Sequence, residues 1–468
     1  MRLVSTRGRA APISFVDAML SGLAPDGGLY VPGAYPQLRP EQIRAMAGKS
    51  YEACALELLT VLTGGEISHD ALAAMIDAAY ATFRHPAVCP LRQVDNGLFF
   101  LELFHGPTLA FKDVAMQLLG RMMNSVLEKE NRHATIVGAT SGDTGGAAIE
   151  AFRGLERTDV FILFPDGRVS DVQRRQMTAV ADANVHALAV DGSFDDCQAI
   201  LKALFGDAAF RDEVRLSGVN SINWARVAAQ TVYYFTAAAA LGAPERAVSF
   251  AVPTGNFGDV LAGWVAKRMG LPVETLVIGV NANDILARTY ETGTYSLRSV
   301  VPTTSPSMDI QVSSNFERLL FEEYHRDSVA VSALMQSLST RRAFSLSEPA
   351  LAKLRDEFFI TSVDEAAVAA EIRRFWQNQE LLVDPHSAVG LAVARRRLAD
   401  VPGTPVIALG TAHPAKFPDA VEAAAGVRPA LPERLKILMS APERMTRLPA
   451  DTATVAAFIR GRARAARC

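Results

Sequence analysis

The stretch His133-Ala-Thr-Ile-Val-Gly-Ala-Thr-Ser-Gly-Asp-Thr-Gly-Gly-Ala-Ala-Ile-Glu-Ala-Phe152 carries the pattern that decides the fold. A short apolar run leads through a turn of Ser, Thr and Gly into a second apolar run that suits a helix. Short strands that alternate with helices predict an α/β protein whose parallel sheets are covered on both faces. The same order recurs along the chain and predicts strands at 98–104, 133–139, 159–164, 185–190, 247–252, 275–280 and 405–409.

The composition limits the class of protein. A length of 468 residues suggests two or three domains, and 49% hydrophobic with 21% charged residues allows a large core. With a formal net charge of -3, the protein as a whole has no electrostatic attraction to nucleic acid or to an anionic membrane surface. The run 227–244 has no charge but contains glutamine and threonine and is rich in alanine, so we interpret it as a buried helix rather than a membrane span.

The cysteines and the N-terminal residues indicate the cellular compartment in which the protein works. Cysteines are scattered, with no CxxC pair and no spacing suited to a metal, at Cys54, Cys89, Cys197 and Cys468. This pattern favours a reducing environment over a disulfide scaffold. The chain begins Met-Arg-Leu-Val-Ser-Thr and shows no apolar stretch of the length that a secretory signal needs, so we expect a cytoplasmic protein. We interpret the arginine-rich tail after residue 459 as a solvated chain end.

Lys112 stands out in the segment His105-Gly-Pro-Thr-Leu-Ala-Phe-Lys-Asp113, where a helix should begin. The apolar residues that follow keep to one helical face, and Thr108 is a candidate helix cap. A helix N-terminus carries partial positive charge, which lowers the pKa of an amine placed there. A lysine in its free-base form can make a Schiff base with an aldehyde. The competing interpretation is an exposed lysine whose stem lies along the helix flank.

Two loops that join a strand to a helix are candidate anion sites. The first, residues 140–146, offers successive backbone amides, three hydroxyls and a helix N-terminus. It lacks the lysine of a Walker loop and the spacing of a dinucleotide fingerprint. The second, residues 254–259, has two glycines that let the backbone approach a phosphate closely. Each loop is also compatible with an ordinary turn.

A third element, Leu409-Gly-Thr-Ala-His-Pro-Ala-Lys-Phe417, follows the last expected strand. Thr411 lies where the carboxyl end of a sheet strand would face a ligand crevice. Its hydroxyl can hydrogen-bond a ring nitrogen without bringing a full charge, although a threonine at this place can also be a simple cap. We interpret His413 as a hydrogen-bonded structural histidine rather than a catalytic one.

Together these segments resemble the threonine synthase family, within the pyridoxal-phosphate enzymes of the tryptophan-synthase-β type. The long N-terminal region is similar to that of the longer bacterial and fungal branch of the family. The set of segments is highly specific, whereas any single segment is not. The matching segments follow the same order over nearly the whole chain, at residues 5–8, 22–29, 105–113, 138–145, 255–259 and 411–417.

The resemblance implies an α/β fold with two parallel-sheet domains and a mainly helical N-terminal region over residues 1–90. A large domain that binds pyridoxal 5'-phosphate is expected at residues 91–116 and 226–468. A small α/β domain is expected at residues 117–225, with the cofactor in the cleft between the two. The implied reaction converts O-phospho-L-homoserine and water to L-threonine and phosphate, which is the last step of threonine biosynthesis.

The resemblance also implies roles for individual residues. Lys112 forms the Schiff base with the cofactor, and Thr411 bonds the pyridine nitrogen. The cofactor, chiefly its phosphate, is held by Gly255, Asn256, Phe257, Gly258 and Asp259. The substrate carboxylate is held by the loop of Thr140, Ser141, Gly142, Asp143 and Thr144.

The substrate phosphate needs a cationic site of its own. We expect Arg288 and Arg318 to supply it, because a guanidinium group can bind phosphate through two parallel hydrogen bonds. No nucleic acid, membrane or metal is expected as a partner, and both a monomer and a dimer are compatible with the sequence.

Two alternative functions stay open at this point. One is another β- or γ-replacement enzyme or dehydratase of the same fold, although the lysine segment lacks the asparagine-containing or Ser-Phe-Lys wording typical of those enzymes. The other is a non-catalytic protein that binds phosphorylated metabolites through the two glycine loops and needs no Schiff base.

Overall fold

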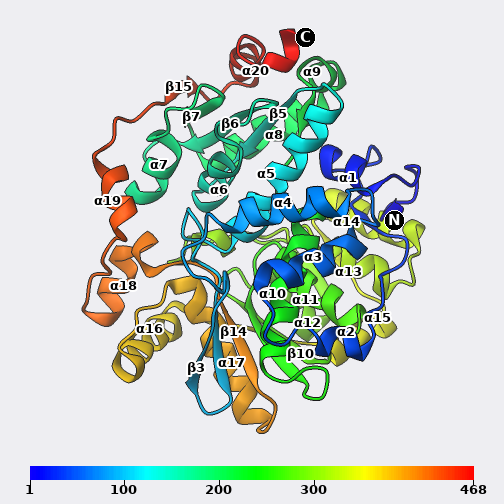
Figure 1. Cartoon of the computed structure of the whole chain (residues 1–468), viewed down its shortest axis with the longest axis vertical. Helices are drawn as coiled ribbons and strands as arrows, with labels where there is room; N and C mark the ends of the chain where they lie inside the picture. Colours follow the sequence, from blue (N-terminus) through cyan, green and yellow to red (C-terminus); the bar gives the residue numbers. More distant parts are fainter. Residues whose placement is uncertain (468) are drawn as a thin grey trace.

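Two β-sheets organise the molecule, and each is sandwiched between helices (Figure 1). The computed structural model of the chain describes residues 1–467, and Cys468 lies outside this part. The five-stranded sheet lies in the upper part of Figure 1 and the six-stranded sheet in the lower part. The predicted α/β class is therefore confirmed.

The six-stranded sheet has the order β13-β10-β9-β14-β4-β3. Its neighbouring strands are parallel, except for the antiparallel edge pair β3–β4. Helices α10 (Trp224–Ala240) and α11 (Gly258–Arg268) pack against one face, and α16 (Glu365–Gln379) and α17 (Pro385–Asp400) against the other. The strands are β3 (Leu91–Asp95), β4 (Leu98–Glu102), β9 (Val248–Pro253), β10 (Val273–Val280), β13 (Phe358–Ser362) and β14 (Val406–Gly410).

The five-stranded sheet has the order β15-β7-β6-β5-β8 and is parallel throughout. One face packs against α5 (Lys112–Lys129) and α6 (Asp143–Phe152), and the other against α8 (Phe194–Gly206) and α20 (Thr452–Arg460). All eight residues of β6 are buried because helices cover both of its faces. The strands are β5 (Ala134–Ala139), β6 (Thr158–Pro165), β7 (Val185–Asp191), β8 (Leu216–Ser217) and β15 (Thr446–Pro449).

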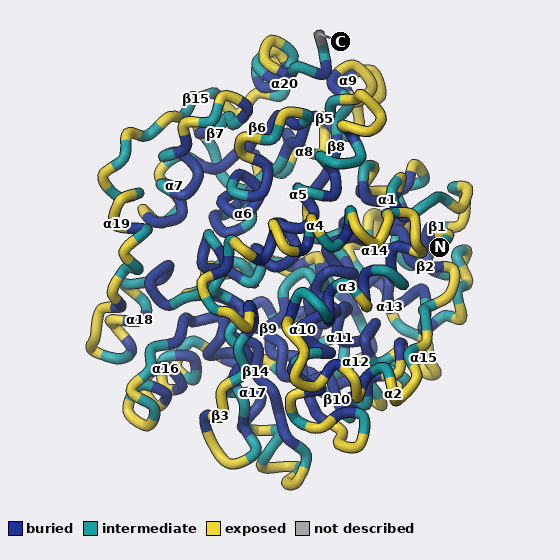
Figure 2. Tube along the Cα trace, viewed as in Figure 1, coloured by how far each residue is buried: buried dark blue, intermediate teal, exposed yellow. Residues whose placement is uncertain are grey.

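All seven strands expected from the apolar runs are present, with ends within two residues of those expected. The uncharged run 227–244 largely forms helix α10, which is buried almost along its whole length, as expected (Figure 2). Among residues 1–467, no helix combines the length and the apolar character needed to cross a membrane.

The C-terminal segment corrects the expected domain boundaries. We expected residues 226–468 to belong to the large domain, but β15 pairs with β7 and α20 packs against α8, so the chain returns to the five-stranded sheet. The red segment in Figure 1 shows this return. The apolar side chains of Val455 and Ile459 are fully buried there, and Arg464 forms an ion pair with Asp159 at 2.8 Å. The tail is therefore a packed element rather than a solvated chain end.

The N-terminal region is mainly helical, as expected, and also contains a two-stranded sheet of β1 (Leu3–Ser5) and β2 (Tyr30–Pro32). Its long helices pack against α10 and α5, and the hydroxyl of Tyr80 donates to the carbonyl of Val114 near the start of α5 at 3.2 Å. The helices are α1 (Phe15–Ser21), α2 (Pro40–Arg44), α3 (Tyr51–Leu62) and α4 (His69–Tyr80).

The remaining elements lie between and after these. Two antiparallel strands, β11 (Thr294–Ser296) and β12 (Ala343–Ser345), pair with each other. The helices are α7 (Asp171–Thr178), α9 (Ala208–Val214), α12 (Ile285–Thr292), η1 (Pro306–Met308), α13 (Phe316–Glu323), α14 (Ser328–Arg341), α15 (Glu348–Glu357), η2 (Pro414–Lys416), α18 (Pro418–Ala425), α19 (Glu433–Ser440) and η3 (Arg464–Arg467).

The returning C-terminal helix makes a stability prediction. Ile459→Ala removes a fully buried side chain from the core beneath α20 and should lower the free energy of unfolding by about 2–4 kcal/mol. The matched control is Ile437→Ala in α19, where 71% of the residue is exposed and the change should stay within about 0.5 kcal/mol. Urea unfolding followed by circular dichroism measures both, and equal midpoints for the two variants would contradict the assignment of α20 to this core.

Candidate active site

Lys112 begins helix α5, as the sequence predicted, and it is buried with 8% of its surface exposed. The interpretation as an exposed lysine is therefore wrong. Thr108 does not cap the helix. Instead, its backbone N–H and its hydroxyl both donate to the carboxylate of Asp113 at 2.7 Å, which folds the preceding loop back onto the first helical turn. Gly106 is required in this loop because a Cβ atom there would collide with Asp113.

The lysine loop pairs with the third sequence element. Phe111 N–H donates to the carbonyl of Thr411 at 2.8 Å, and His413 N–H donates to the carbonyl of Leu109 at 3.0 Å. The ammonium group of Lys416 donates to the carbonyl of Thr108 at 2.9 Å. These contacts form a short antiparallel bridge that places segments 105–113 and 409–417 side by side, although the bridged residues Ala110 and Ala412 lie 302 positions apart in sequence.

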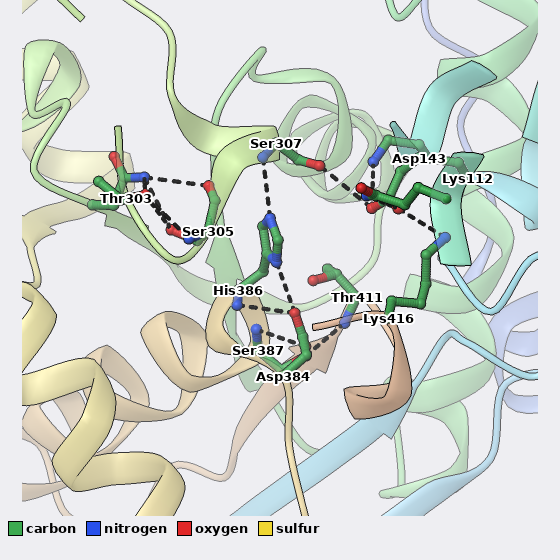
Figure 3. A network of polar contacts seen from close by, with 12 residues as sticks. Lys112, Asp143, Thr303, Ser305, Ser307, Asp384, His386, Ser387, Thr411 and Lys416 are labelled. Carbon is green, nitrogen blue, oxygen red and sulfur yellow. Dashed lines mark hydrogen bonds and ion pairs between the residues drawn. The ribbon is translucent and has the colours of Figure 1, made fainter. Parts of the chain in front are cut away.

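One carboxylate, that of Asp143 at the start of α6, lies at the centre of the site (Figure 3). It contacts the ammonium groups of Lys416 at 2.7 Å and Lys112 at 3.5 Å. It also accepts hydrogen bonds from the amide of Gln173 at 2.9 Å and the hydroxyl of Ser307 at 3.4 Å. The site thus gathers groups from both sheets around a single buried anion.

Burial and neighbouring charges set the protonation of these groups. Burial lowers the pKa of Lys112, the anion of Asp143 opposes this effect, and the cations of Lys416 and Arg226 lower the pKa further. Burial alone would raise the pKa of Asp143, but the ammonium groups of Lys416 and Lys112 outweigh it and hold that pKa well below its usual range. The expected lowering for Lys112 is present, and its largest cause is burial.

The loop 254–259 connects β9 to α11 and has the form of an anion cradle. Helix α11 begins at Gly258, and the first backbone N–H groups of a helix have no partner within it. Phe257 adopts a left-handed conformation with φ 62°, and the carbonyl of Asn256 accepts from the backbone and side-chain amides of Asn315. The backbone of the loop is therefore held in one shape by its neighbours.

Asp259 has a different environment from the rest of this loop. Its carboxylate accepts hydrogen bonds from the hydroxyls of Tyr233 and of Tyr234, the second at 2.9 Å. Burial raises the pKa of Asp259 to about 6, against the effect of these hydrogen bonds and of Lys112. The Asp259 side chain thus braces α11 against α10.

Thr411 has the hydrogen-bonding capacity that a ring nitrogen requires. It is 5% exposed, and its hydroxyl has no partner among residues 1–467. Its backbone N–H donates to the hydroxyl of Ser387 at 2.9 Å, and that hydroxyl donates to Asp384. Asp384 also accepts from His386 Nδ1 at 2.7 Å, and His386 Nε2 accepts from the backbone N–H of Ser307 at 3.2 Å. This network, drawn in Figure 3, fixes the position of Thr411.

The loop 140–144 is held by its own side chains. The hydroxyl oxygen of Thr140 accepts from the N–H groups of Gly142 at 2.9 Å and Gly145 at 3.0 Å. Gly142 has a φ of 146°, and a Cβ atom there would collide with Gln173. The carboxylate of Asp143 cannot itself hold a substrate carboxylate, because the two would repel.

Arg288 and Arg318 do not supply a free cationic site. Arg318 is 1% exposed and donates to the carbonyls of Tyr30 at 2.9 Å and Ile222 at 2.6 Å, as well as to Asn315. Arg288 forms an ion pair with Asp284 at 2.8 Å and donates to a backbone carbonyl. Both guanidinium groups crosslink this chain, so the structure argues against the expected phosphate role.

His413 is structural in its contacts, in line with the interpretation from sequence. Its Nδ1 atom accepts from the backbone N–H of Ala415 at 3.1 Å, and burial lowers its pKa to about 4. The sequence reasoning missed three buried polar residues that the fold adds to the site, namely Lys416, His386 and Arg226. Lys416 lies within the segment 409–417, three residues after His413. Its place in that segment was the one feature of the sequence that could have indicated a role in the site.

The site has the features that a pyridoxal-phosphate enzyme needs. A buried amine of lowered pKa, an amide cradle at a helix N-terminus and an unpartnered hydroxyl suit the aldehyde, the phosphate and the ring nitrogen of that cofactor. The family model described as "Pyridoxal-phosphate dependent enzyme" matches residues 85–334. The fold and site thus define the chain as a pyridoxal-phosphate-dependent enzyme.

More specific comparisons narrow this class. Two family models, "Threonine synthase N terminus" and "Threonine synthase, C-terminal", match residues 2–80 and 387–459. A threonine synthase of Pseudomonas aeruginosa is 47% identical over 98% of both chains. The crystal structure of a PLP-bound threonine synthase from Brucella melitensis is 58% identical, covers 99% of this chain and 100% of its own, and has a TM-score of 0.96. A yeast threonine synthase structure has a TM-score of 0.93, with 39% identity and 98% coverage of both chains. The chain belongs to the threonine synthase family.

The buried carboxyl of Asp259 generates a prediction about pH. Its pKa of about 6 in the folded chain exceeds the usual value of 3.8, so folding binds a proton and the free energy of unfolding falls as pH rises between these values. Asp259→Asn keeps a hydrogen-bond acceptor for the two tyrosine hydroxyls. It also removes the titrating carboxyl and with it this fall in the free energy of unfolding. Relative to the wild type, the variant should gain up to about 3 kcal/mol between pH 4 and pH 7.

Urea unfolding at a series of pH values, at one fixed cofactor concentration, measures this difference. Asp70→Asn, at an exposed site, is the matched surface control. Parallel pH curves for Asp259→Asn and the wild type would show that the carboxyl of Asp259 does not carry this effect.

Proposed function

We propose that this chain converts O-phospho-L-homoserine and water to L-threonine and phosphate, with Lys112 as the lysine that binds pyridoxal 5'-phosphate. One observation carries the assignment of Lys112. The amine of Lys112 is buried beside Asp143, and its pKa is lowered. The loop that leads to Lys112 is bridged to the segment that carries the unpartnered hydroxyl of Thr411. The family places this reaction on the chain, and the geometry supports these residues as the ones that perform it.

Different residues of the site would bind different parts of the cofactor. The backbone amides of Gly255, Asn256, Phe257 and Gly258, at the N-terminus of α11, would hold its phosphate. The hydroxyl of Thr411 would donate to the ring nitrogen, and Lys112 would supply the amine for the aldehyde of the cofactor. When bound, the cofactor supplies an electron sink for the bonds that break at the substrate. The Asp259 side chain serves the cradle by bracing α11.

The same residues hold and move protons at the substrate. Lys112 Nζ, in its free-base form, accepts and returns the proton at the substrate α-carbon. The backbone amides of the loop 140–144, with the hydroxyls of Ser141 and Thr144, bind the substrate carboxylate at the N-terminus of α6. The anion of Asp143 holds the two lysines at this place instead of binding the substrate directly.

The domain division and the compartment complete the proposal. We propose a small domain around the five-stranded sheet that includes the C-terminal strand β15 and helix α20, with the remaining α/β elements in the large domain. We also propose that the enzyme works in the cytoplasm. Three cysteines, Cys54, Cys89 and Cys197, are buried as free thiols, which suits a reducing environment.

Lys112→Ala tests the assignment of the lysine. The variant should lose the visible absorbance of the lysine-bound cofactor and at least about 10³-fold in phosphate release from O-phospho-L-homoserine, because a bond and a proton carrier are both removed. Lys436→Ala, at an exposed lysine of α19, is the control and should keep colour and turnover.

Borohydride reduction of the wild type, followed by peptide mapping, should label Lys112. A yellow and active Lys112→Ala variant would refute the assignment. Labelling at Lys112 without phosphate release from O-phospho-L-homoserine, but with turnover of serine or threonine, would favour a dehydratase. No label at all would favour a phosphometabolite-binding protein.

Thr411→Val tests the contact to the ring nitrogen. The substitution keeps the shape and removes the hydroxyl, so one hydrogen bond worth about 1 kcal/mol is lost and turnover should fall by roughly fivefold to tenfold. The visible absorption band should also shift. The matched control is Thr231→Val in α10, a buried threonine whose hydroxyl donates to a helical carbonyl at 2.7 Å. An unaltered spectrum and rate in Thr411→Val would count against the contact.

A further inference from the structure

Two buried lysines share one carboxylate in the active site, and they share it unequally. Lys416 Nζ lies 2.7 Å from Asp143 Oδ1, whereas Lys112 Nζ lies 3.5 Å from Asp143 Oδ2. Lys416 has no exposed surface and is also held by the carbonyl of Thr108 at 2.9 Å. Because the Coulomb attraction between two charges rises as their separation falls, Asp143 stabilises the charge of Lys416 more than that of Lys112.

The position of Lys416 is well determined by the chain around it. It ends the short helix η2, whose segment is bridged to the lysine loop through Ala110 and Ala412. On the other side, Gln173 donates to the same Asp143 oxygen at 2.9 Å and fixes its direction. The ion pair between Lys416 and Asp143 therefore cannot shift toward Lys112 without disturbing both neighbouring elements.

The charges that face Lys112 come from several elements. Asp143 of α6 is an anion, and Lys416 of η2 and Arg226 of α10 are cations. Asp259 of α11 is a buried carboxyl that also senses the charge of Lys112, and His386 of α17 faces Asp143. Because Asp143 lies closer to Lys416 than to Lys112, it compensates a proton on Lys112 less than it compensates the charge of Lys416.

We propose that Lys416 is a positioning residue that holds the carboxylate of Asp143 and thereby favours the unprotonated form of the Lys112 amine, which is the form that binds the cofactor aldehyde. This inference rests on the proposed role of Lys112 and goes beyond it by naming the group that controls its protonation. The burial of Lys112 and the cation of Arg226 act in the same direction. If Lys416 were lost, Asp143 would pair with Lys112 and stabilise its ammonium form.

The test measures cofactor capture by the full-length chain from which the cofactor has been removed. Capture joins Lys112 Nζ to the aldehyde carbon of pyridoxal 5'-phosphate with loss of water, and it requires the unprotonated amine. The second-order rate of capture, followed by absorbance between pH 6 and pH 10, should show an acid limb that reports the protonation of Lys112. The pH profile of turnover is measured in parallel.

In Lys416→Met, the acid limb should move to higher pH by about one unit, so the capture rate on the limb falls by roughly tenfold. Lys416→Arg keeps the cation and should stay within about threefold of the wild type. Asp143→Asn removes the shared anion and should move the limb to lower pH. Lys436→Met is the surface control, with an unchanged profile.

The double variant Lys416→Met with Asp143→Asn removes both charges of the ion pair and should return the limb to the wild-type position or below it. A Lys416→Met variant that is folded by circular dichroism but keeps the wild-type limb overturns the proposal. If Lys416→Met does not fold, the proposal stands or falls on Asp143→Asn, and an unmoved limb in that variant overturns it. A wild type that captures no cofactor at Lys112 would instead refute the proposed function itself.

Discussion

The buried carboxylate of Asp143 is the constraint around which the active site is built. An anion in a dry interior is costly unless cations and hydrogen-bond donors surround it. Here they come from Lys112, Lys416, Gln173 and Ser307, which belong to four separate segments of the chain. Because Asp143 starts a helix of the five-stranded sheet and Lys416 follows a strand of the six-stranded one, this anion links elements of the two sheets.

A second feature, a backbone bridge, joins this charge cluster to the segment of Thr411. The antiparallel bridge between the lysine loop and the segment after β14 brings the segments that carry Lys112, Thr411 and Lys416 together. The bridge is possible because β14 and β4 are parallel neighbours, so the loops at their carboxyl ends leave the same edge of the sheet. The amine of Lys112 and the hydroxyl of Thr411 are thereby carried by segments that pair with each other.

Much of the fold was predictable from sequence because the two sheets are buried on both faces. A strand covered by helices on both sides must be apolar at every position, and such runs are visible without alignment, as in β6 and β9. The glycine loops were visible for a related reason, since close approach of backbone to a ligand demands small residues. Strand β15 was missed because its four residues lie at a sheet edge and are not buried, so they carry no apolar pattern.

The residues of the site were less predictable than the fold. Arginine is a good phosphate ligand in general, yet the guanidinium group of Arg318 donates to backbone carbonyls of this chain. The local sequence around Arg318 does not indicate these partners. His386 and Arg226 sit within helices whose local patterns are those of ordinary core helices. Whether a buried polar side chain serves a ligand or the protein depends on which partners the fold brings to it.

The sequence by itself determined the class of fold, the family and the lysine to examine, because apolar periodicity and glycine-rich loops are local properties that the chain displays in order. The tertiary structure alone decided that the C-terminus returns to the five-stranded sheet, that Arg288 and Arg318 are crosslinks, and that Lys416 shares a carboxylate with Lys112. Those outcomes depend on burial and on distances between residues far apart in the chain. Electrostatic energies in a protein interior are set by such distances, and no local pattern encodes them.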